Sequence, residues 1–367
     1  MSRRQKMQTD HPFLLRSQKA AAALCFIAAA QSSHAQSALT LFGGVDLGVR
    51  MVNNSAGTTK GMNSGNNYTS RWGLRAQEDL GGGHKASLWL ESTINADTGS
   101  SNPQFFDRRS TVALSGDWGE VRMGRDYTPV FRGYGIAEVF DFAGLASMTT
   151  IYNGSASTVL SRAFKGKTSS NGRTNGSLQY FTPDSLGGFH LSAMLSRSGD
   201  GNVSGDHDYK GLRVGYSRGP WQTAAFAGST EIRISGGNYR IRGGSAAYRL
   251  GTGKLTAGVV NMRYLDARQT NYTLGLIWPL GIHQVKATWH HIDQAGRNAA
   301  GASIDRNDAD LMAIGYVHNL SKRTALYGTL AFIRNRGQAS FSITGESMGA
   351  RPGGNARGLE LGLRHMF

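Results

Sequence analysis

The stretch that decides the fold class is Leu39-Thr40-Leu41-Phe42-Gly43-Gly44-Val45-Asp46-Leu47-Gly48-Val49-Arg50. Its odd-numbered positions are apolar or glycine, whereas its even-numbered positions include Thr40, Asp46 and Arg50. A period of two is typical of a β-strand with one face in an apolar medium and the other in a polar one. The same alternation recurs in residues 71–77, 85–91 and 272–280. The sequence therefore predicts an all-β protein.

Composition excludes several other classes. The chain has 367 residues, of which 39% are hydrophobic and 17% charged, with 50 glycines and a single cysteine. No apolar run reaches the roughly 18–20 residues that a membrane-spanning helix needs, and one cysteine cannot form a disulfide within the chain. Aromatic residues recur along the whole length, which argues against disorder. A soluble β-sandwich and a membrane β-barrel are left.

The first 35 residues have the pattern of an export signal. Basic residues from Arg3 to Lys19 precede an apolar segment at 20–30, and Ser33-His34-Ala35 supplies the small residues before a cleavage site. We therefore predict a signal peptide over 1–35 and a mature domain over 36–367. The formal net charge of +16 is high. Because an exported protein rarely meets nucleic acid, this charge points to small anions or anionic lipid surfaces as partners.

Short and long connections alternate along the mature chain. Seven short turns rich in Gly, Pro, Ser and Asp are predicted at 80–83, 115–118, 184–188, 217–221, 250–253, 279–281 and 319–322. Longer polar stretches lie at 53–67, 98–104, 198–205, 231–238, 295–307 and 337–355. This asymmetry is typical of an outer-membrane barrel with short periplasmic turns and long external loops. Seven turns with both termini on the turn side predict a transmembrane barrel of 16 antiparallel strands.

The end of the chain supports the barrel over a soluble sandwich. Leu359, Leu361, Leu363, His365 and Phe367 share one face of the last predicted strand, and the chain stops at that phenylalanine. A terminal strand of this kind resembles the assembly signal of bacterial outer-membrane barrels, which assigns that role to Phe367.

One long segment interrupts the alternation. Nearly fifty residues, about 128–174, separate the strand that ends near Tyr127 from the one that resumes at Asn175. Connections of this length are usually functional or disordered. The first half carries Phe131, Tyr134 and Phe140, a composition that favours packing. We therefore predict a third loop folded into the lumen, with a disordered loop as the alternative.

The chain resembles the general porins of β-proteobacteria, and among them most of all the anion-selective members. The matching stretches are 39–49, 70–75, 78–83, 106–114, 119–125, 179–183, 315–327 and 362–367. The resemblance implies a sixteen-stranded homotrimer in the Gram-negative outer membrane, whose inward third loop narrows a channel for passive diffusion of small hydrophilic solutes. The expected partners are outer-membrane lipid and lipopolysaccharide together with small anions, and no cofactor is expected.

Charged side chains in such a channel set its selectivity. Alternation predicts that Arg71, Arg75, Arg122 and Arg173 face inward, and the family resemblance points to Arg71, Arg108 and Arg173 as the constriction arginines. On the strand that contains Val112, which is expected to face lipid, alternation instead turns Arg109 inward and Arg108 outward. A bulge would be needed to bring Arg108 inward. Opposite these arginines we expect three acidic residues, Glu138 and Asp141 from the loop and Glu91 from the third strand.

Other chemistries find weak support. Residues 200–205 imitate the start of a calcium loop, but Gly211 stands where a bidentate glutamate is needed. His290 and His291 are adjacent on a predicted strand and would point to opposite faces, so we expect no metal site. The alternatives to a general diffusion channel are a substrate-specific outer-membrane channel and, on scattered Ser, His and Asp residues, an outer-membrane hydrolase. Because these scattered residues form no catalytic motif, we predict no catalytic residues.

Overall fold

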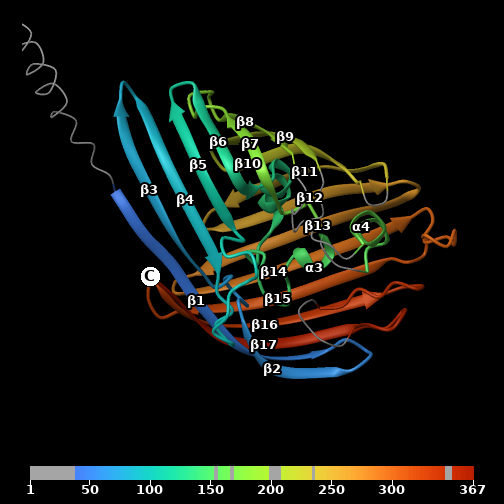
Figure 1. Cartoon of the computed structure of the whole chain (residues 1–367). Coiled ribbons are helices and arrows are strands. Elements are labelled where there is room, and N and C mark those ends of the chain that lie inside the picture. The colour runs from blue at the N-terminus through green and yellow to red at the C-terminus, as the bar shows by residue number, and fades with distance from the viewer. Residues whose placement is uncertain (1–37, 153–155, 166–168, 198–207, 234–235, 344–348) are drawn as a thin grey trace, which may run out of the picture.

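The computed structural model describes residues 38–152, 156–165, 169–197, 208–233, 236–343 and 349–367. They form one antiparallel sheet that curls into a barrel, with short helices inside it (Figure 1). The predicted signal peptide at 1–35 lies outside these residues. The strands are β1 (Ala38–Asn53), β2 (Thr58–Ser64), β3 (Arg71–Gly81), β4 (His84–Thr93), β5 (Arg109–Gly116), β6 (Gly119–Tyr127), β7 (Arg173–Phe181), β8 (Phe189–Ser196), β9 (Tyr209–Arg218), β10 (Trp221–Glu231), β11 (Asn238–Leu250), β12 (Gly253–Tyr264), β13 (Ala267–Leu280), β14 (His283–Ala295), β15 (Ala309–Asn319), β16 (Thr324–Asn335) and β17 (Ala356–Met366).

The barrel closes between its first and last strands. β1 pairs with β17 from Gly44↔Met366 to Asn53↔Arg357. On its other side β1 pairs with β3 through its first half and with β2 through its second half. β2 and β3 therefore follow each other in one position, and the closed barrel has 16 strands. The terminal Phe367 exchanges backbone hydrogen bonds with Gly43 at this seam.

The alternation read from the sequence matches the two faces of the wall. On β13 the apolar residues Tyr272, Leu274 and Leu280 are exposed on the outer face. On β17, Leu359, Leu361 and Leu363 are exposed in the same way, whereas the intervening Glu360 is buried on the inner face. In a membrane protein these exposed apolar side chains contact hydrocarbon. None of the helices in the described part of the chain is long and apolar enough to cross a membrane.

All seven predicted short turns connect adjacent strands at one end of the barrel. The prediction of a loop over 53–67 is wrong in part, because 58–64 form β2, which extends the β1 hairpin. Asp46 explains the break that follows, since its carboxylate accepts hydrogen bonds from the backbone amides of Asn66, Asn67 and Tyr68. The predicted loop at 198–205 lies outside the described residues.

The long connection between β6 and β7 folds inside the barrel. It contains the helices α2 (Pro129–Tyr134), η1 (Gly135–Ala137), α3 (Thr149–Tyr152) and α4 (Thr158–Phe164). Helix α2 contacts β8–β12, and α4 contacts β12 and β13. We call residues 128–172 the inner loop. Helix α4 lies in the second half of the inner loop, so Thr158–Phe164 are folded against the wall as the first half is.

The inner wall is not polar throughout. This corrects the expectation, drawn from the alternation, that the inward-facing side chains are polar. Ile241, Met262 and Leu311 face inward and are fully buried against inner-loop residues such as Ile151 and Leu145. Burial against the loop replaces contact with water, so apolar residues are favoured on both faces there. The apolar core of this barrel is therefore the interface between the inner loop and the wall.

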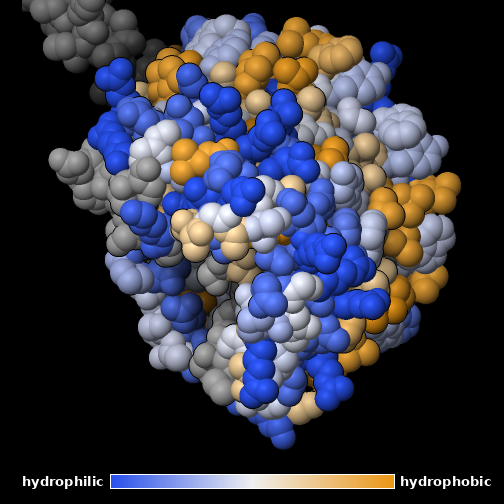
Figure 2. Space-filling model, turned by 90° about the vertical axis from the view of Figure 1, so that its right-hand side faces the viewer, coloured by the Kyte–Doolittle hydropathy of each residue, from blue (hydrophilic) through white to orange (hydrophobic). Residues whose placement is uncertain are grey.

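The outer surface combines a polar end with an apolar flank. Figure 2 turns the loop ends of the strands toward the viewer. Hydrophilic side chains cover this end, and hydrophobic ones gather along the flank at the right of the view. This distribution is expected of a barrel whose flank lies in lipid and whose loops lie in water.

Candidate pore constriction

Three predicted arginines meet around Glu91 and Tyr127. Arg108 donates from Nε to Glu91 Oε1 at 2.5 Å, and Arg71 Nη1 lies 3.4 Å from the same oxygen. Arg108 and Arg173 both donate to the hydroxyl of Tyr127, at 3.0 and 2.5 Å. We call these five residues the upper cluster. Since Arg71 keeps 28% of its side chain exposed, it is the member of the Glu91 ion pairs most open to water.

The choice between Arg108 and Arg109 is resolved without a bulge. β4 and β5 pair regularly from Lys85↔Ser115 to Glu91↔Arg109, so the proposed bulge after Arg108 is absent from this pair. Arg109 faces inward, as alternation predicts, and stacks on Trp89. Arg108 precedes the first residue of β5, where the alternation of the strand no longer fixes its side chain. Both arginines therefore reach the lumen.

Arg173 joins the upper cluster from the end of its strand. The register between β6 and β7 shifts between Gly124 and Asp126. Counting alternate residues from Ser177 back to Arg173 therefore crosses an irregularity, and the parity argument does not hold there. The guanidinium lies over the ring of Tyr127, 4.1 Å from its centroid. This ring, rather than strand parity, orients Arg173.

A second group of arginines surrounds Asp126. Arg122 and Arg132 bind its carboxylate at 2.7 and 3.0 Å, and Arg109 Nε lies 3.8 Å from it. Arg122 also pairs with Glu120. Asp126 is fully buried, whereas Arg132 keeps 29% of its side chain exposed. We call Arg109, Arg122, Asp126 and Arg132 the lower cluster. In both clusters each carboxylate is shared by more than one arginine, so positive charge is in excess.

Glu138 does not face the arginines, which corrects its predicted place. Its carboxylate accepts hydrogen bonds from the backbone amides of Val139, Phe140 and Met148 at 2.6–2.9 Å. The residue is buried within the inner loop, and this burial raises its pKa to about 7 against the hydrogen bonds of those amides. Glu138 therefore organises the loop, since one carboxylate joins two of its turns.

The other two acidic residues differ in their positions. Asp141 is mostly exposed on the inner loop, and its nearest cation is Lys286 of β14, at 3.5 Å. Glu91 lies among the arginines on their own wall instead of facing them, because β4 pairs directly with β3 and β5. Of the three predicted acids only Asp141 is exposed on the loop side.

The tip of the inner loop is attached to the far wall of the barrel. The amide of Gly144 donates to the carbonyl of Gly65, and the amide of Leu145 donates to Glu360 of β17. Gly144 has a positive φ of 67°, and a Cβ there would lie 2.1 Å from the carbonyl oxygen of Asn66. Only glycine fits this contact. The loop thus spans the lumen from β6 to the β17/β1 seam.

Sequence reasoning missed three side chains that hold the clusters together. Tyr127 joins Arg108 to Arg173, Asp126 joins the lower cluster, and Tyr68 accepts from Arg71 Nε at 2.7 Å. Asp126 shares i,i+4 spacing with Arg122, a signal that could have been used. Arg75, by contrast, is exposed on β3 and makes no ion pair with the described residues.

The paired histidines lie as the sequence predicts. His290 is buried on the inner face against Thr273 and Thr288, and His291 on the outer face binds Asp310 at 2.9 Å. Within the part of the chain that the structure describes, no group of three or more His, Cys, Asp or Glu residues could hold a metal ion.

Residues 20–338 match the model of the Gram-negative porin family. The chain belongs to that family. The porin is 34% identical over 366 residues to outer membrane porin protein 32 of Delftia acidovorans, covering 95% of this chain and 99% of the relative. It is therefore an outer-membrane protein of the porin type, with its 16 strands crossing that membrane.

Solved structures agree with the fold. The anion-selective porin from Comamonas acidovorans superimposes with a TM-score of 0.76 and 32% identity, covering 90% of this porin and all of that chain. A trimer form of OmpT from Vibrio cholerae superimposes with a TM-score of 0.63 at 14% identity, covering 90% of this porin and 99% of that chain. At this identity, the match with OmpT shows only that the two chains share a fold.

Proposed function

We propose that this porin is a diffusion channel for small hydrophilic solutes that conducts anions in preference to cations. The observation that carries the proposal is the excess of guanidinium groups over carboxylates in the upper and lower clusters. Fixed positive charge in a narrow aqueous passage lowers the energy of a passing anion and raises that of a cation. The 32% identity to the anion-selective porin from Comamonas acidovorans supports the same conclusion.

The constriction in this proposal lies between the two arginine clusters and the inner loop. The arginines come from β3, β5, β6 and β7 and from the loop end before β5, and Arg132 alone comes from α2 of the inner loop itself. Helices α2 and α4 cover the wall from β8 to β13. Asp141 is the loop residue that supplies negative charge across the passage. Opposed charges of this kind produce a transverse field that holds the arginine side chains extended.

The working assembly in this proposal is a homotrimer exported by the signal peptide at 1–35, with Phe367 as its assembly signal. The trimer in this proposal comes from the resemblance to general porins, and a Vibrio protein of the same fold has a trimer form. Its lipid partners are those of the outer membrane, including lipopolysaccharide. A hydrolase is not favoured, because the matched relatives are porins.

Planar-bilayer recording in a KCl gradient tests the proposal. We expect a reversal potential with the same sign as the equilibrium potential of chloride. A potential of the opposite sign would refute anion selectivity, and an absence of conductance by the folded protein would refute the channel. A current that saturates and is blocked by one solute would favour the substrate-specific alternative.

A further inference from the structure

A row of basic side chains crosses the outer face of the barrel near its loop end. Strand register places Arg240 of β11 opposite Arg263 of β12, and Arg263 opposite Arg268 of β13. On the other side, Ser229 of β10 lies between Arg240 and Lys210 of β9. We call Lys210, Arg240, Arg263 and Arg268 the basic row. All four residues are exposed.

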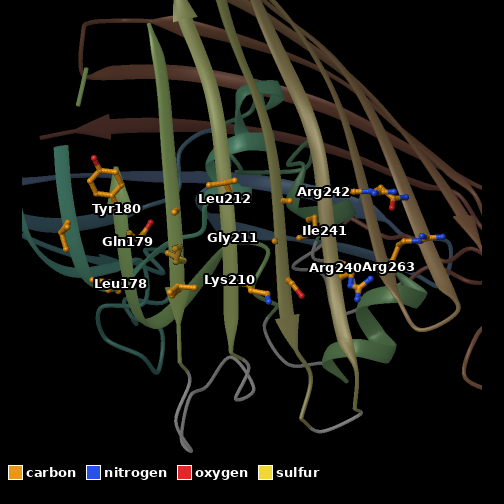
Figure 3. A pocket seen from close by; sticks show the side chains of 18 residues that line it. Leu178, Gln179, Tyr180, Lys210, Gly211, Leu212, Arg240, Ile241, Arg242 and Arg263 are labelled. Atoms are coloured by element: carbon orange, nitrogen blue, oxygen red, sulfur yellow. The ribbon is translucent and has the colours of Figure 1, made fainter. Parts of the chain in front are cut away.

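The basic row faces outward because its neighbours along the strands face inward. Tyr239, Ile241 and Met262 are buried in the core formed with the inner loop. Successive side chains of a strand point to opposite faces, so Arg240 and Arg263 point away from the lumen. Figure 3 shows Arg240 and Arg263 side by side on neighbouring strands, with Lys210 at the same level. These cations therefore belong to the lipid-facing surface and not to the channel.

The height of the row places it beside lipid headgroups. On β13 the outward apolar residues run from Tyr272 to Leu280. Nine strand residues tilted by about 40° span an apolar band of roughly 25 Å. Arg268 lies beyond this band on the loop side, about 10 Å above Tyr272 by the same geometry. Since the long loops of such barrels are extracellular, the row meets the headgroups of the outer leaflet.

Like charges directly opposite one another destabilise a pair of strands. Among the described residues, no carboxylate forms an ion pair with any member of the basic row. Glu231 shares a hollow with Lys210 at the loop edge, and Asp208 of the same hollow pairs with Arg233 at 3.4 Å. Elsewhere on the outer face the protein does supply a counter-ion, since Arg336 binds Asp310 at 2.7 Å. Arg240 and Arg263 therefore have no ion-pair partner among the described carboxylates, whereas Asp305 in the loop after β14 lies within electrostatic range of Arg268.

An amphipathic hollow continues from the row toward the membrane. It has a volume of about 780 Å³ and spans β6–β12 on the outer wall. Arg240, Arg242 and Arg263 line one part of it, and Leu178 and Leu212 are among the apolar residues that line another part (Figure 3). Leu195 lines the hollow as well. Guanidinium groups bind phosphate oxygens through paired charge-assisted hydrogen bonds, and the leucines offer a surface for an acyl chain.

We propose that this surface binds a phosphorylated lipid of the outer leaflet. The phosphate lies between Arg240 and Arg263, and an acyl chain rests in the leucine-lined hollow. The phosphate offsets the repulsion across β11, β12 and β13. The proposal rests on the outer-membrane part of the proposed function and is independent of anion selectivity.

Lipid-binding titration tests the site, with diphosphorylated lipid A as the probe and the full mature protein folded in detergent. We expect the double variant Arg240→Gln/Arg263→Gln to weaken binding by about tenfold or more, because each arginine loses charge-assisted hydrogen bonds. The control is Arg218→Gln, an exposed outward arginine at the turn end of β9, which we expect to bind as the wild type does. Dephosphorylated lipid A should bind as weakly as the double variant does.

Four results would overturn the proposal. The first three are equal binding by the double variant, equal loss in the Arg218→Gln control, and equal binding of dephosphorylated lipid A. Competition by inorganic phosphate at the concentration of the lipid would identify free phosphate as the ligand, which also overturns a lipid site. Heat-dependent mobility on a denaturing gel confirms that each variant is folded. The double variant should keep the wild-type reversal potential, so that a cation-selective wild type would refute the proposed function and leave the lipid site standing.

Discussion

Arg71→Gln is the most direct perturbation of the proposed selectivity. Arg71 is the more exposed of the two arginines that share Glu91, and Arg108 keeps its own 2.5 Å bond to that carboxylate after the substitution. The variant therefore removes one positive charge from the upper cluster without leaving Glu91 unpaired. Glutamine retains much of the length of the side chain and can still accept from or donate to Tyr68.

The size of the effect follows from Coulomb's law. A unit charge about 7 Å from a passing ion in a water-like dielectric contributes about 0.6 kcal/mol, and screening at roughly 0.1 M salt halves this value. Because the sign is opposite for anions and cations, the two differ by about 0.6 kcal/mol. We therefore expect the anion-to-cation permeability ratio to fall roughly threefold.

Reversal potentials in a KCl gradient at low ionic strength measure this ratio. The outer-wall variant Arg240→Gln is the matched control, since it removes the same charge from the opposite face of the wall. An unchanged ratio in Arg71→Gln, with wild-type conductance, would refute the role of the upper cluster. A fall of the same size in Arg240→Gln would show that total charge, rather than the constriction, sets the selectivity.

Three further outcomes are expected. Glu91→Gln leaves the buried Arg108 without its carboxylate and should destabilise the folded protein by about 3 kcal/mol, measured as a lower thermal unfolding midpoint; an unchanged midpoint would contradict the ion-pair geometry. Gly144→Ala places an alanine at a φ of 67° and its Cβ against Asn66, which costs about 1–3 kcal/mol. We expect the released loop tip to increase single-channel current noise. The variant Gly219→Ala, in an exposed turn with open space around it, should not increase the noise. The pKa of Glu138 is about 7 in the folded inner loop, against an ordinary 4.5, so the folded loop binds the proton more tightly and its stability should rise as pH falls from about 7 to about 4.5. Glu138→Gln should reduce this pH dependence of the unfolding midpoint, and an identical pH profile in wild type and variant would exclude the contribution of Glu138.

Most of the fold could be predicted because its determinants are local. Alternation along 39–50 and 272–280 separates two solvents residue by residue, and the glycine-rich turns at 80–83 or 250–253 need no distant partner. The site was predictable in part, as Arg71 and Arg122 follow strand parity. Arg108 lies outside its strand and Arg173 lies beyond a register shift, so strand alternation could not predict the direction of either side chain.

By itself, the sequence determined the class of the protein, the number of strands and the face of each regular strand position, since these depend on neighbours one or two residues away. Only the tertiary structure decided which charges meet. Glu138 is held by amides within the loop, Glu91 lies among the arginines, and Arg240 stands beside Arg263. These contacts depend on strand register and on the path of the inner loop, which are set by packing between segments far apart in the chain.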